Sequence, residues 1–235
     1  MAIYTIADLH LSFSENKPMS IFGENWEKHE EKIKQNWLQT VKENDLVVLP
    51  GDFSWAMYLE DTKEDFAYLE KLPGKKLLLK GNHDYWWTTL NSMRNFLKEI
   101  ECNSIDFLYN NSYEWENYII AGTRGWSLQE AEDSPKMWNR ENERLKLSLE
   151  SAKKLQAETN KEIIVFMHYP PITNHEGENT CFLETMKSYG VKKCFYGHLH
   201  SSSHKEAVQG EIDGIEFTLV SADYLDFKLY KIGWK

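Results

Sequence analysis

The fold is decided by the stretch Lys76-Leu77-Leu78-Leu79-Lys80-Gly81-Asn82-His83-Asp84, in which an apolar run ends abruptly in polar residues. Three consecutive leucines are typical of a strand that is buried on both faces of a parallel sheet. The polar residues that follow carry chemically active side chains. Because ligands of open α/β sheets bind at the carboxyl ends of strands, the stretch predicts a functional site as well as a strand.

Four other predicted strands end in the same manner, each in candidate ligands for a metal ion. If the five strands are adjacent, their polar ends meet at one edge of a sheet. Three of the five ends contain a glycine, which lets the backbone approach a bound ion closely. The four further ends are Asp8-Leu9-His10 after 3–7, Pro50-Gly51-Asp52 after 46–49, His168 after 163–167, and Gly197-His198-Leu199-His200 after 194–196.

Strands and helices are predicted to alternate along the chain, which indicates an α/β fold. The segment 211–229 has strand-like pieces separated by turn residues, so some antiparallel pairing is expected there. No linker-like or repetitive stretch interrupts residues 1–235, and we expect one domain. The remaining predicted strands are 118–121 and 217–220, and apolar residues recur at helical spacing over 26–41, 66–72, 90–100 and 145–155.

The candidate ligands are of two chemical kinds, oxygen donors and imidazole nitrogens. Such a mixed set suits Mn, Fe, Zn or Co and contains too much nitrogen for Mg or Ca. Seven ligands suffice for two ions if one carboxylate bridges them, and Asp52 is the expected bridge because a carboxylate has two oxygens. The candidates are Asp8, Asp52 and Asn82 for oxygen, and His10, His168, His198 and His200 for nitrogen.

These blocks, in this order, resemble the signature of the calcineurin-like metallophosphoesterase superfamily: Asp-x-His, Gly-Asp, Gly-Asn-His-Asp/Glu, a single His and Gly-His-x-His. The resemblance runs from Asp8 to His200, about five-sixths of the chain. It implies a four-layer sandwich of two mixed β-sheets flanked by helices, with a dimetal site at the carboxyl ends of strands. It also implies one metal held by Asp8, His10, Asp52 and His200, and a second held by Asp52, Asn82, His168 and His198.

The resemblance further implies metal-dependent hydrolysis of phosphate esters, in which a hydroxide activated by two metals attacks phosphorus. In the family, the His of Gly-Asn-His donates a proton to the leaving oxygen. Here that residue is His83, and Asp84 is expected to orient and charge its imidazole. General acid catalysis needs such a group, with a pKa near neutral, beside the leaving oxygen. Two divalent or trivalent transition-metal ions are expected, with Mn and Fe favoured.

One block departs from the family pattern. Many members read Gly-Asp-x-x-Asp, whereas Gly51-Asp52-Phe53-Ser54-Trp55 places an indole at the last position. Outer carboxylates commonly orient metal-bound histidines, so another acid must replace this one, or one imidazole is held differently. The expected substrate contacts are Trp55, Arg124 and His175, because an indole stacks on flat groups and a guanidinium matches phosphate oxygens. Core packing, an ion pair and an ordinary loop position are the respective alternatives.

The composition limits where the protein acts and on what. A formal net charge of -10 argues against non-specific binding of nucleic acid. Three cysteines without close pairing, no long apolar stretch and no signal-peptide pattern predict a soluble cytoplasmic protein without membrane association. We expect a small phosphate ester as substrate, while the oligomeric state stays open.

Two other functions are alternatives. A phosphodiesterase or nuclease acting on nucleotides or DNA is the alternative among enzymes. A non-catalytic interaction module on the same fold is the alternative outside enzymes. The presence of His83 together with every candidate ligand argues against the non-catalytic module.

Overall fold

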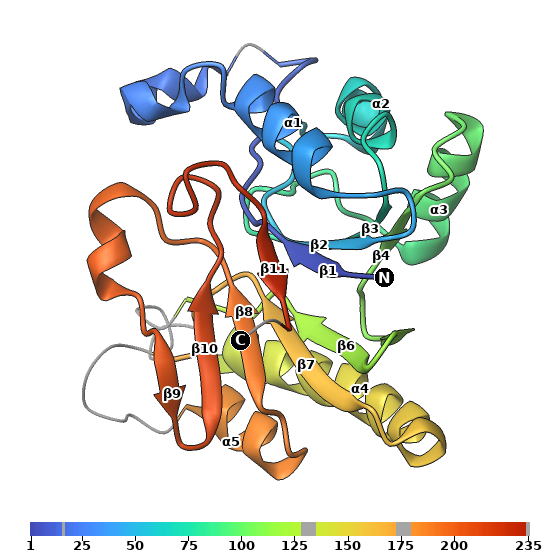
Figure 1. Cartoon of the computed structure of the whole chain (residues 1–235), viewed down its shortest axis with the longest axis vertical. Coiled ribbons are helices and arrows are strands. Elements are labelled where there is room, and N and C mark those ends of the chain that lie inside the picture. The colour runs from blue at the N-terminus through green and yellow to red at the C-terminus, as the bar shows by residue number, and fades with distance from the viewer. Residues whose placement is uncertain (16, 128–134, 173–179, 234–235) are drawn as a thin grey trace.

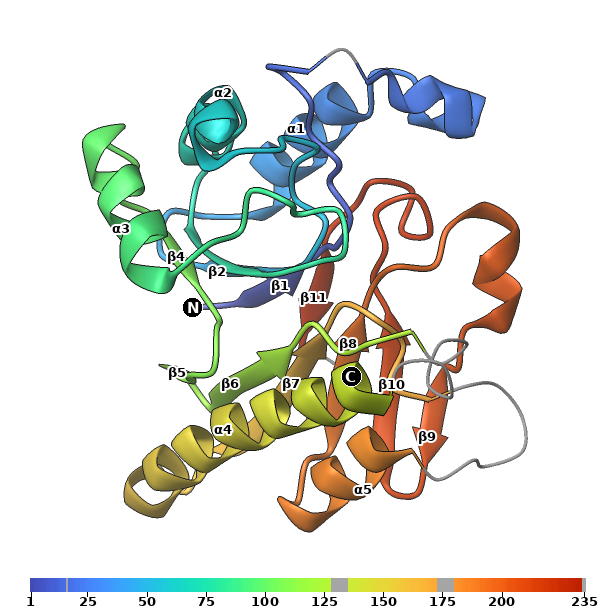
Figure 2. The ribbon, with the colours of Figure 1, turned by 180° about the vertical axis from the view of Figure 1, so that it is seen from behind.

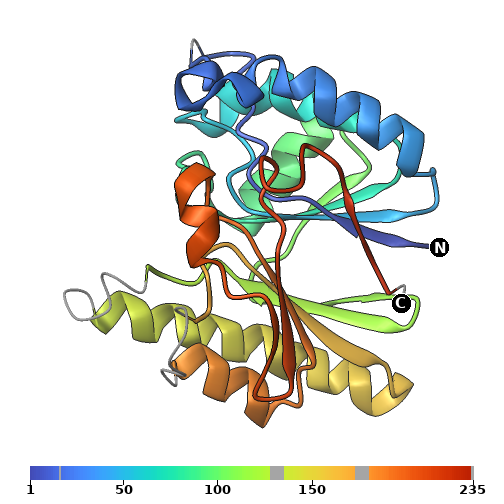
Figure 3. The same cartoon turned by 60° about the vertical axis from the view of Figure 1, so that its left-hand side comes forward.

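The structure, a computed structural model, describes residues 1–15, 17–127, 135–172 and 180–233 of the chain. Two β-sheets lie face to face, and helices cover the outer face of each sheet (Figures 1 and 3). The order of layers is therefore helices, sheet, sheet, helices. This arrangement confirms the predicted α/β sandwich of two mixed sheets.

The first sheet has the strand order β11-β1-β2-β3-β4. Strand β11 is antiparallel to β1, and the other neighbours are parallel. All five residues of β2 are buried, as the continuous apolar run of a doubly covered parallel strand requires. The bounds are β1 Ile3–Thr5, β2 Leu46–Pro50, β3 Lys75–Leu79, β4 Ile105–Phe107 and β11 Tyr230–Ile232.

The second sheet has the order β5-β6-β7-β8-β10-β9, with four parallel strands between two antiparallel edges. All seven predicted strands are present, and the antiparallel pairing expected within 211–229 is that of β9 with β10. Strands β4, β5, β9 and β11 were not predicted. The bounds are β5 Tyr113–Trp115, β6 Tyr118–Thr123, β7 Glu162–Met167, β8 Lys193–Tyr196, β9 Gly210–Ile212 and β10 Ile215–Leu219.

Helices α1, α2 and α3 cover the first sheet, and α4 and α5 cover the second (Figures 1 and 2). None of the helices in the described ranges is long and apolar enough to cross a lipid bilayer. The α-helices are α1 His29–Thr40, α2 Lys63–Glu70, α3 Leu90–Glu99, α4 Pro135–Thr159 and α5 Cys181–Ser188. In the described part of the chain, four 3₁₀ helices occupy loops: η1 Met19–Phe22, η2 Glu24–Trp26, η3 Leu59–Thr62 and η4 Ser201–Glu206.

Three apolar cores hold the layers together. One lies between the first sheet and its helices and contains Trp37 and Phe66. A second joins the other sheet to α4 and α5 through residues such as Leu149 and Phe182. The third, between the two sheets, includes Phe166, which is fully buried. Burial of this apolar surface is the main force that fixes the sandwich.

The two sheets are also joined by backbone hydrogen bonds beyond the carboxyl ends of β1 and β10. The Ala7 N–H donates to the Val220 carbonyl at 2.8 Å, and the Ala222 N–H donates to the Ala7 carbonyl at 3.0 Å. The chain leaving the first sheet is therefore paired with the chain leaving the second. This junction places the polar loops of both sheets at the same end of the molecule.

Candidate dimetal centre

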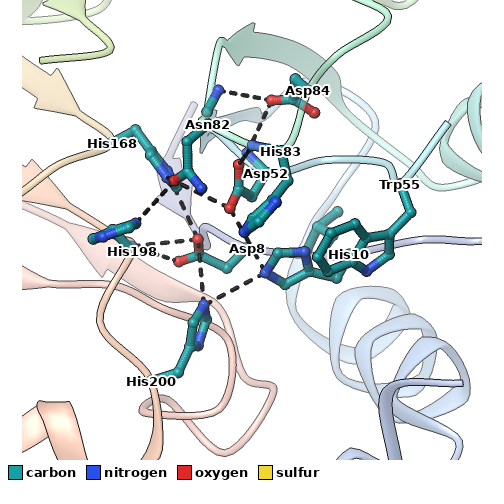
Figure 4. A network of polar contacts seen from close by, with 12 residues as sticks. Asp8, His10, Asp52, Trp55, Asn82, His83, Asp84, His168, His198 and His200 are labelled. Atoms are coloured by element: carbon teal, nitrogen blue, oxygen red, sulfur yellow. Dashed lines mark hydrogen bonds and ion pairs between the residues drawn. The ribbon is translucent and has the colours of Figure 1, made fainter. Parts of the chain in front are cut away.

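The seven predicted ligands come together at the junction between the sheets, although five different strands deliver them (Figure 4). Asp8, Asp52 and His168 are almost completely buried, and His198 and His200 are half-buried. Asp8 and His10 follow β1, Asp52 follows β2, Asn82 follows β3, His168 follows β7, and His198 and His200 follow β8.

Four of the ligand residues have backbone conformations that non-glycine residues seldom adopt. Asp8, His10, Asp52 and His198 have φ values of 61°, 46°, 53° and 72°. Such left-handed residues cost free energy and gather at functional sites, where the surrounding structure holds them. Hydrogen bonds from the Asp8 N–H to the Gly51 carbonyl and from the His10 N–H to the Asp52 carbonyl, 3.0 and 2.9 Å long, supply that support.

The first group of donors is formed by Asp8, His10, Asp52 and His200. The Nε2 atoms of His10 and His200 are 3.4 Å apart. His10 Nε2 is 3.8 Å from Asp52 Oδ2, and His200 Nε2 is 3.7 Å from Asp8 Oδ1. This is the set that the family resemblance implies for one metal.

The second group is formed by Asp52, Asn82, His168 and His198. Oδ1 of Asn82 lies 2.6 Å from His168 Nε2 and 2.9 Å from His198 Nδ1. His168 Nε2 is also 3.5 Å from Asp52 Oδ2, the same oxygen that faces His10. Asp52 therefore belongs to both groups through one oxygen, because its Oδ1 accepts the His83 N–H at 2.8 Å.

The proton positions in the second group fit a bound cation. His168 Nδ1 is 3.1 Å from the Pro50 carbonyl, which can only accept, so this nitrogen carries the proton and Nε2 presents a lone pair. Burial lowers the pKa of His168 to about 3, so the imidazole is neutral. Two acceptors, His168 Nε2 and Asn82 Oδ1, thus face each other at 2.6 Å. A metal ion between such lone pairs turns their repulsion into coordination.

The buried carboxylates are also stabilised by positive charge nearby. Burial, followed by the charges of Asp84 and Asp8, raises the pKa of Asp52 well above its usual value. Burial alone would lower the pKa of His200, but the charge of Asp8 and a hydrogen bond to Asp223 raise it to about 10. A cation near Asp8 and Asp52 is therefore strongly favoured.

Glycines keep the ligand atoms close together. A Cβ on Gly81 would overlap with Asp52 Oδ1, and one on Gly51 would lie 2.5 Å from His168 Nδ1. Both positions are far inside van der Waals contact. Any side chain at these positions would displace a ligand, which explains the glycines before Asp52 and Asn82.

Asp84 has a different role from the one expected. Its carboxylate accepts the backbone N–H groups of Gly81, Asp52, Phe53 and Ser54 at 2.7 to 3.2 Å, and the indole N–H of Trp86 at 3.1 Å. Its oxygens thus bind the loops after β2 and β3 to each other. The prediction that Asp84 orients and charges His83 is wrong, since these five donors occupy the carboxylate and Nδ1 of His83 has no hydrogen-bond partner among the described residues.

Trp55 fills the position of the missing carboxylate with an apolar wall. Its ring stacks on His10, with centroids 4.9 Å apart, and lies 4.4 Å from the ring of His83. The indole N–H donates to the sulfur of Met19 at 3.2 Å, and Lys17 lies over the ring. The indole therefore faces the site, whereas stacking on a substrate stays a prediction.

The outer carboxylate that the sequence did not reveal is Asp223. Its Oδ1 lies 2.8 Å from Nδ1 of His200, and its Oδ2 lies 3.2 Å from His204 Nε2. Accepting the Nδ1 proton leaves Nε2 of His200 free to bind a metal. Asp223 follows β10 in the second sheet, and no short motif links it to His200. Only the parallel pairing of β8 with β10 brings the two residues together.

The other two predicted substrate residues have different outcomes. Arg124 forms an ion pair with Glu141 at 3.3 Å and lies over the ring of Trp126. At least part of its guanidinium therefore takes part in a structural ion pair, which was the alternative to a substrate contact. His175 lies outside the described residues, and its role stays a prediction.

Replacing Asp84 by alanine tests whether this carboxylate is a structural acceptor. Five buried donors would lose their partner, and one unsatisfied buried donor costs about 1–3 kcal/mol. We therefore expect Asp84→Ala to lower the free energy of unfolding, measured in urea, by about 3 kcal/mol or more. The control Asp226→Asn removes a charge that is 82% exposed, keeps a residue type that tolerates the left-handed φ of 53° at this position, and should have little effect. Unchanged stability with slower catalysis would instead assign Asp84 to His83.

A second replacement tests the contact between Asp223 and His200. Asp223→Asn removes the negative charge that holds the Nδ1 proton, so metal affinity should fall by about 10- to 100-fold. Calorimetric titration of the metal-free protein with Mn²⁺ measures this affinity. The matched control is Asp226→Asn, three positions later and exposed, which should bind Mn²⁺ as the wild type does. Equal affinities in both variants would rule out a positioning role for Asp223.

Comparisons with known proteins agree with this geometry. The family model described as calcineurin-like phosphoesterase matches residues 1–202. No curated protein matches the sequence. The structure is similar to that of the phosphopantetheinyl hydrolase PptH from Mycobacterium tuberculosis, with a TM-score of 0.53 and 14% identity over 98% of this chain and 95% of that one.

A second similar structure is that of TT1561 from Thermus thermophilus. It has a TM-score of 0.54 and 14% identity over 98% of this chain and 97% of the other. At such low identity, both likenesses show the fold alone. The family is established by the match over most of the sequence, and the chain belongs to the calcineurin-like phosphoesterases.

Proposed function

We propose that the protein hydrolyses small phosphate esters with two transition-metal ions, Mn or Fe in preference, held by the two groups of ligands. Membership of the family supports a metal-dependent phosphoesterase in general. The observation that carries the finer proposal is the position of Asp52 Oδ2, within 3.8 Å of His10 Nε2 and 3.5 Å of His168 Nε2. One carboxylate oxygen shared by two donor groups suits two adjacent ions.

The residues of the two donor groups would hold two metal ions, whose chemistry would be Lewis-acid charge for the phosphoryl oxygens and a more acidic water. The protein supplies the rest. Asp8 and Asp52 balance positive charge, while Asn82 and the four histidines fix the position of that charge. Because four of the seven candidate ligands are buried, their charges and dipoles lie in a medium of low dielectric constant, where electrostatic interactions are strong.

In this proposal, His83 donates a proton to the leaving oxygen. Its backbone N–H is held by Asp52 Oδ1, and its ring lies 5.7 Å from that of His10, between centroids. Nδ1 is buried, which leaves Nε2 as the nitrogen for proton transfer. Burial lowers the pKa of His83, and the negative charge of a bound phosphate opposes this effect by favouring the protonated imidazole.

The metal content of variants tests the shared carboxylate. Wild-type protein reconstituted with Mn²⁺ should contain two ions per chain by elemental analysis, and Asp52→Ala should lose both, because each donor group loses the same oxygen. The control Asp65→Asn changes another buried carboxylate, which binds Ser54 and the Phe13 N–H, and should keep both ions. An Asp52→Ala protein that still held two ions would exclude the shared role.

A series of esters with graded leaving-group pKa tests His83. His83→Asn should keep both ions but lower kcat for an alkyl phosphate by about 10²- to 10⁴-fold, the usual contribution of general acid catalysis. A nitrophenyl ester should lose much less, since nitrophenolate leaves without a proton. Equal losses along the series would argue against the acid role, and a lost metal would make His83 a ligand. Parallel assays with diesters and single-stranded DNA separate the esterase proposal from a diesterase or nuclease.

A further inference from the structure

A polar cavity lies between the segment after β3 and the amino-terminal half of α4. Its volume is about 510 Å³, which is within the range of small-molecule sites. The wall is formed by residues that follow β3, β4 and β6 and by residues of α4. They are Lys80, Trp87 to Leu90, Tyr109, Arg124, Met137, Arg140, Glu141 and Arg144.

This cavity is strongly positive in a protein whose formal net charge is -10. Four of its lining residues are cations, Lys80, Arg124, Arg140 and Arg144, and one is an anion, Glu141. The lining therefore has three more positive than negative groups. Such a concentration of like charge in one hollow is unfavourable unless an anion is bound there, so it indicates a ligand and not a structural ion-pair network.

The ion pairs within the cavity do not remove this excess. Glu141 is buried and lies 3.3 Å from Arg124 and 3.6 Å from Arg144, so one carboxylate is shared between two guanidinium groups. Lys80 and Arg140 have no ion-pair partner within the described part of the chain. Two buried donors of the lining, Arg124 Nε and Trp87 Nε1, also have no acceptor among the described residues. Unsatisfied donors of this kind are rare in folded proteins.

The cavity is connected to the metal ligands through the backbone. Lys80 immediately precedes the turn Gly81-Asn82, which delivers a ligand of the second group. The carbonyl of Arg124 accepts the N–H of His168, another ligand of that group, at 3.2 Å. Figure 3 shows the amino-terminal half of α4 at the same end of the sandwich as the carboxyl ends of the strands. The cavity and the candidate ligands Asn82 and His168 are therefore carried by adjoining backbone segments at the same end of the sandwich.

We propose that this cavity binds a second phosphate group of the substrate, so that the preferred substrates are small molecules carrying two phosphates. This inference rests on the proposed phosphoesterase function, because the first phosphate is the one that the dimetal centre hydrolyses. Guanidinium groups suit the task, since their donors match phosphate oxygens in pairs. The size of the cavity and its single cluster of cations favour a small ligand over a nucleic-acid backbone, which needs a positive stripe along a surface.

Binding of non-hydrolysable ligands tests the cavity independently of catalysis. The Mn²⁺-loaded protein is titrated calorimetrically with α,ω-alkane bisphosphonates of graded length and with alkylphosphonates of matched length. The best bisphosphonate should bind about tenfold or more tightly than its monophosphonate, as expected for charge-assisted contacts. Lys80→Gln/Arg140→Gln should abolish this preference without touching the partners of Glu141, and higher salt should weaken it.

The control Lys153→Gln/Lys154→Gln removes two exposed charges from the same helix, about 20 Å beyond Arg140 at 1.5 Å per residue. It should keep the preference for bisphosphonates. No preference in the wild type, or an equal preference in the Lys80→Gln/Arg140→Gln variant, would overturn the inference. Tighter binding of a short oligothymidylate that is lost in the same variant would overturn it in favour of a nucleic-acid backbone.

Hydrolysis of alkanediol bisphosphates and monophosphates separates failure of this inference from failure of the proposed function. We expect kcat/KM to be about tenfold or more higher for the bisphosphate of best length, and this ratio to fall in Lys80→Gln/Arg140→Gln but not in the control. Equal kcat/KM for both substrates would reject the second phosphate site and keep the phosphoesterase. Hydrolysis of neither, with the bisphosphonate preference intact, would support the anion site and reject the phosphoesterase.

Discussion

The burial of Asp8 and Asp52 in one site is the constraint on which the rest of the structure depends. Neither carboxylate has a Lys or Arg ion-pair partner within the described residues, and both are almost completely removed from water. Two adjacent buried carboxylates repel each other and lose solvation, which costs far more than an ordinary fold tolerates without positive charge. The surrounding imidazoles show what compensates this charge. They are arranged around the carboxylates as ligands of a metal ion would be, so cations bound there would contribute to the stability of this end of the sandwich.

A single sheet would not meet this constraint, because its ligands come from both sheets. β1, β2 and β3 of the first sheet deliver four ligands, and β7 and β8 of the second deliver three. The backbone pairing of Ala7 with Val220 and Ala222 brings these sets together directly before Asp8. The four left-handed ligand residues then turn the chain sharply at the point of contact. Tertiary pairing thus offsets a local conformational cost that the sequence alone would not favour.

The sequence was sufficient for features that depend on strand interiors and on residues directly after them. Strand-like runs marked seven of the described strands, and the ordered polar ends marked the seven candidate ligands that the structure brings together. Strands β4, β5, β9 and β11 have three residues each, and so has β1, but the strand-like run that contains β1 continues to Ala7. The other four gave too short a periodic signal, and their pairing depends on neighbours. The same limit applies to Asp223, whose partner His200 is 23 positions away. The role predicted for Asp84 was wrong for a different reason. Its adjacency to His83 in the sequence suggested a contact, but the side chains of consecutive residues need not face each other.

The replacement of a carboxylate by Trp55 changes how the site can control His83. An acid at this position would hold the imidazole by a directional hydrogen bond and a fixed negative charge. The indole instead restricts the ring by contact, at 4.4 Å between centroids, and contributes no charge. The same ring also packs on the ligand His10, so one apolar group limits the movement of a ligand and of the candidate acid together. Because an apolar wall also excludes water, the proposed interaction between His83 and a leaving oxygen would take place in a medium of low dielectric constant, where it would be stronger. At this position, contact with the Trp55 ring and a low dielectric constant thus act on the His83 imidazole in place of a charged carboxylate.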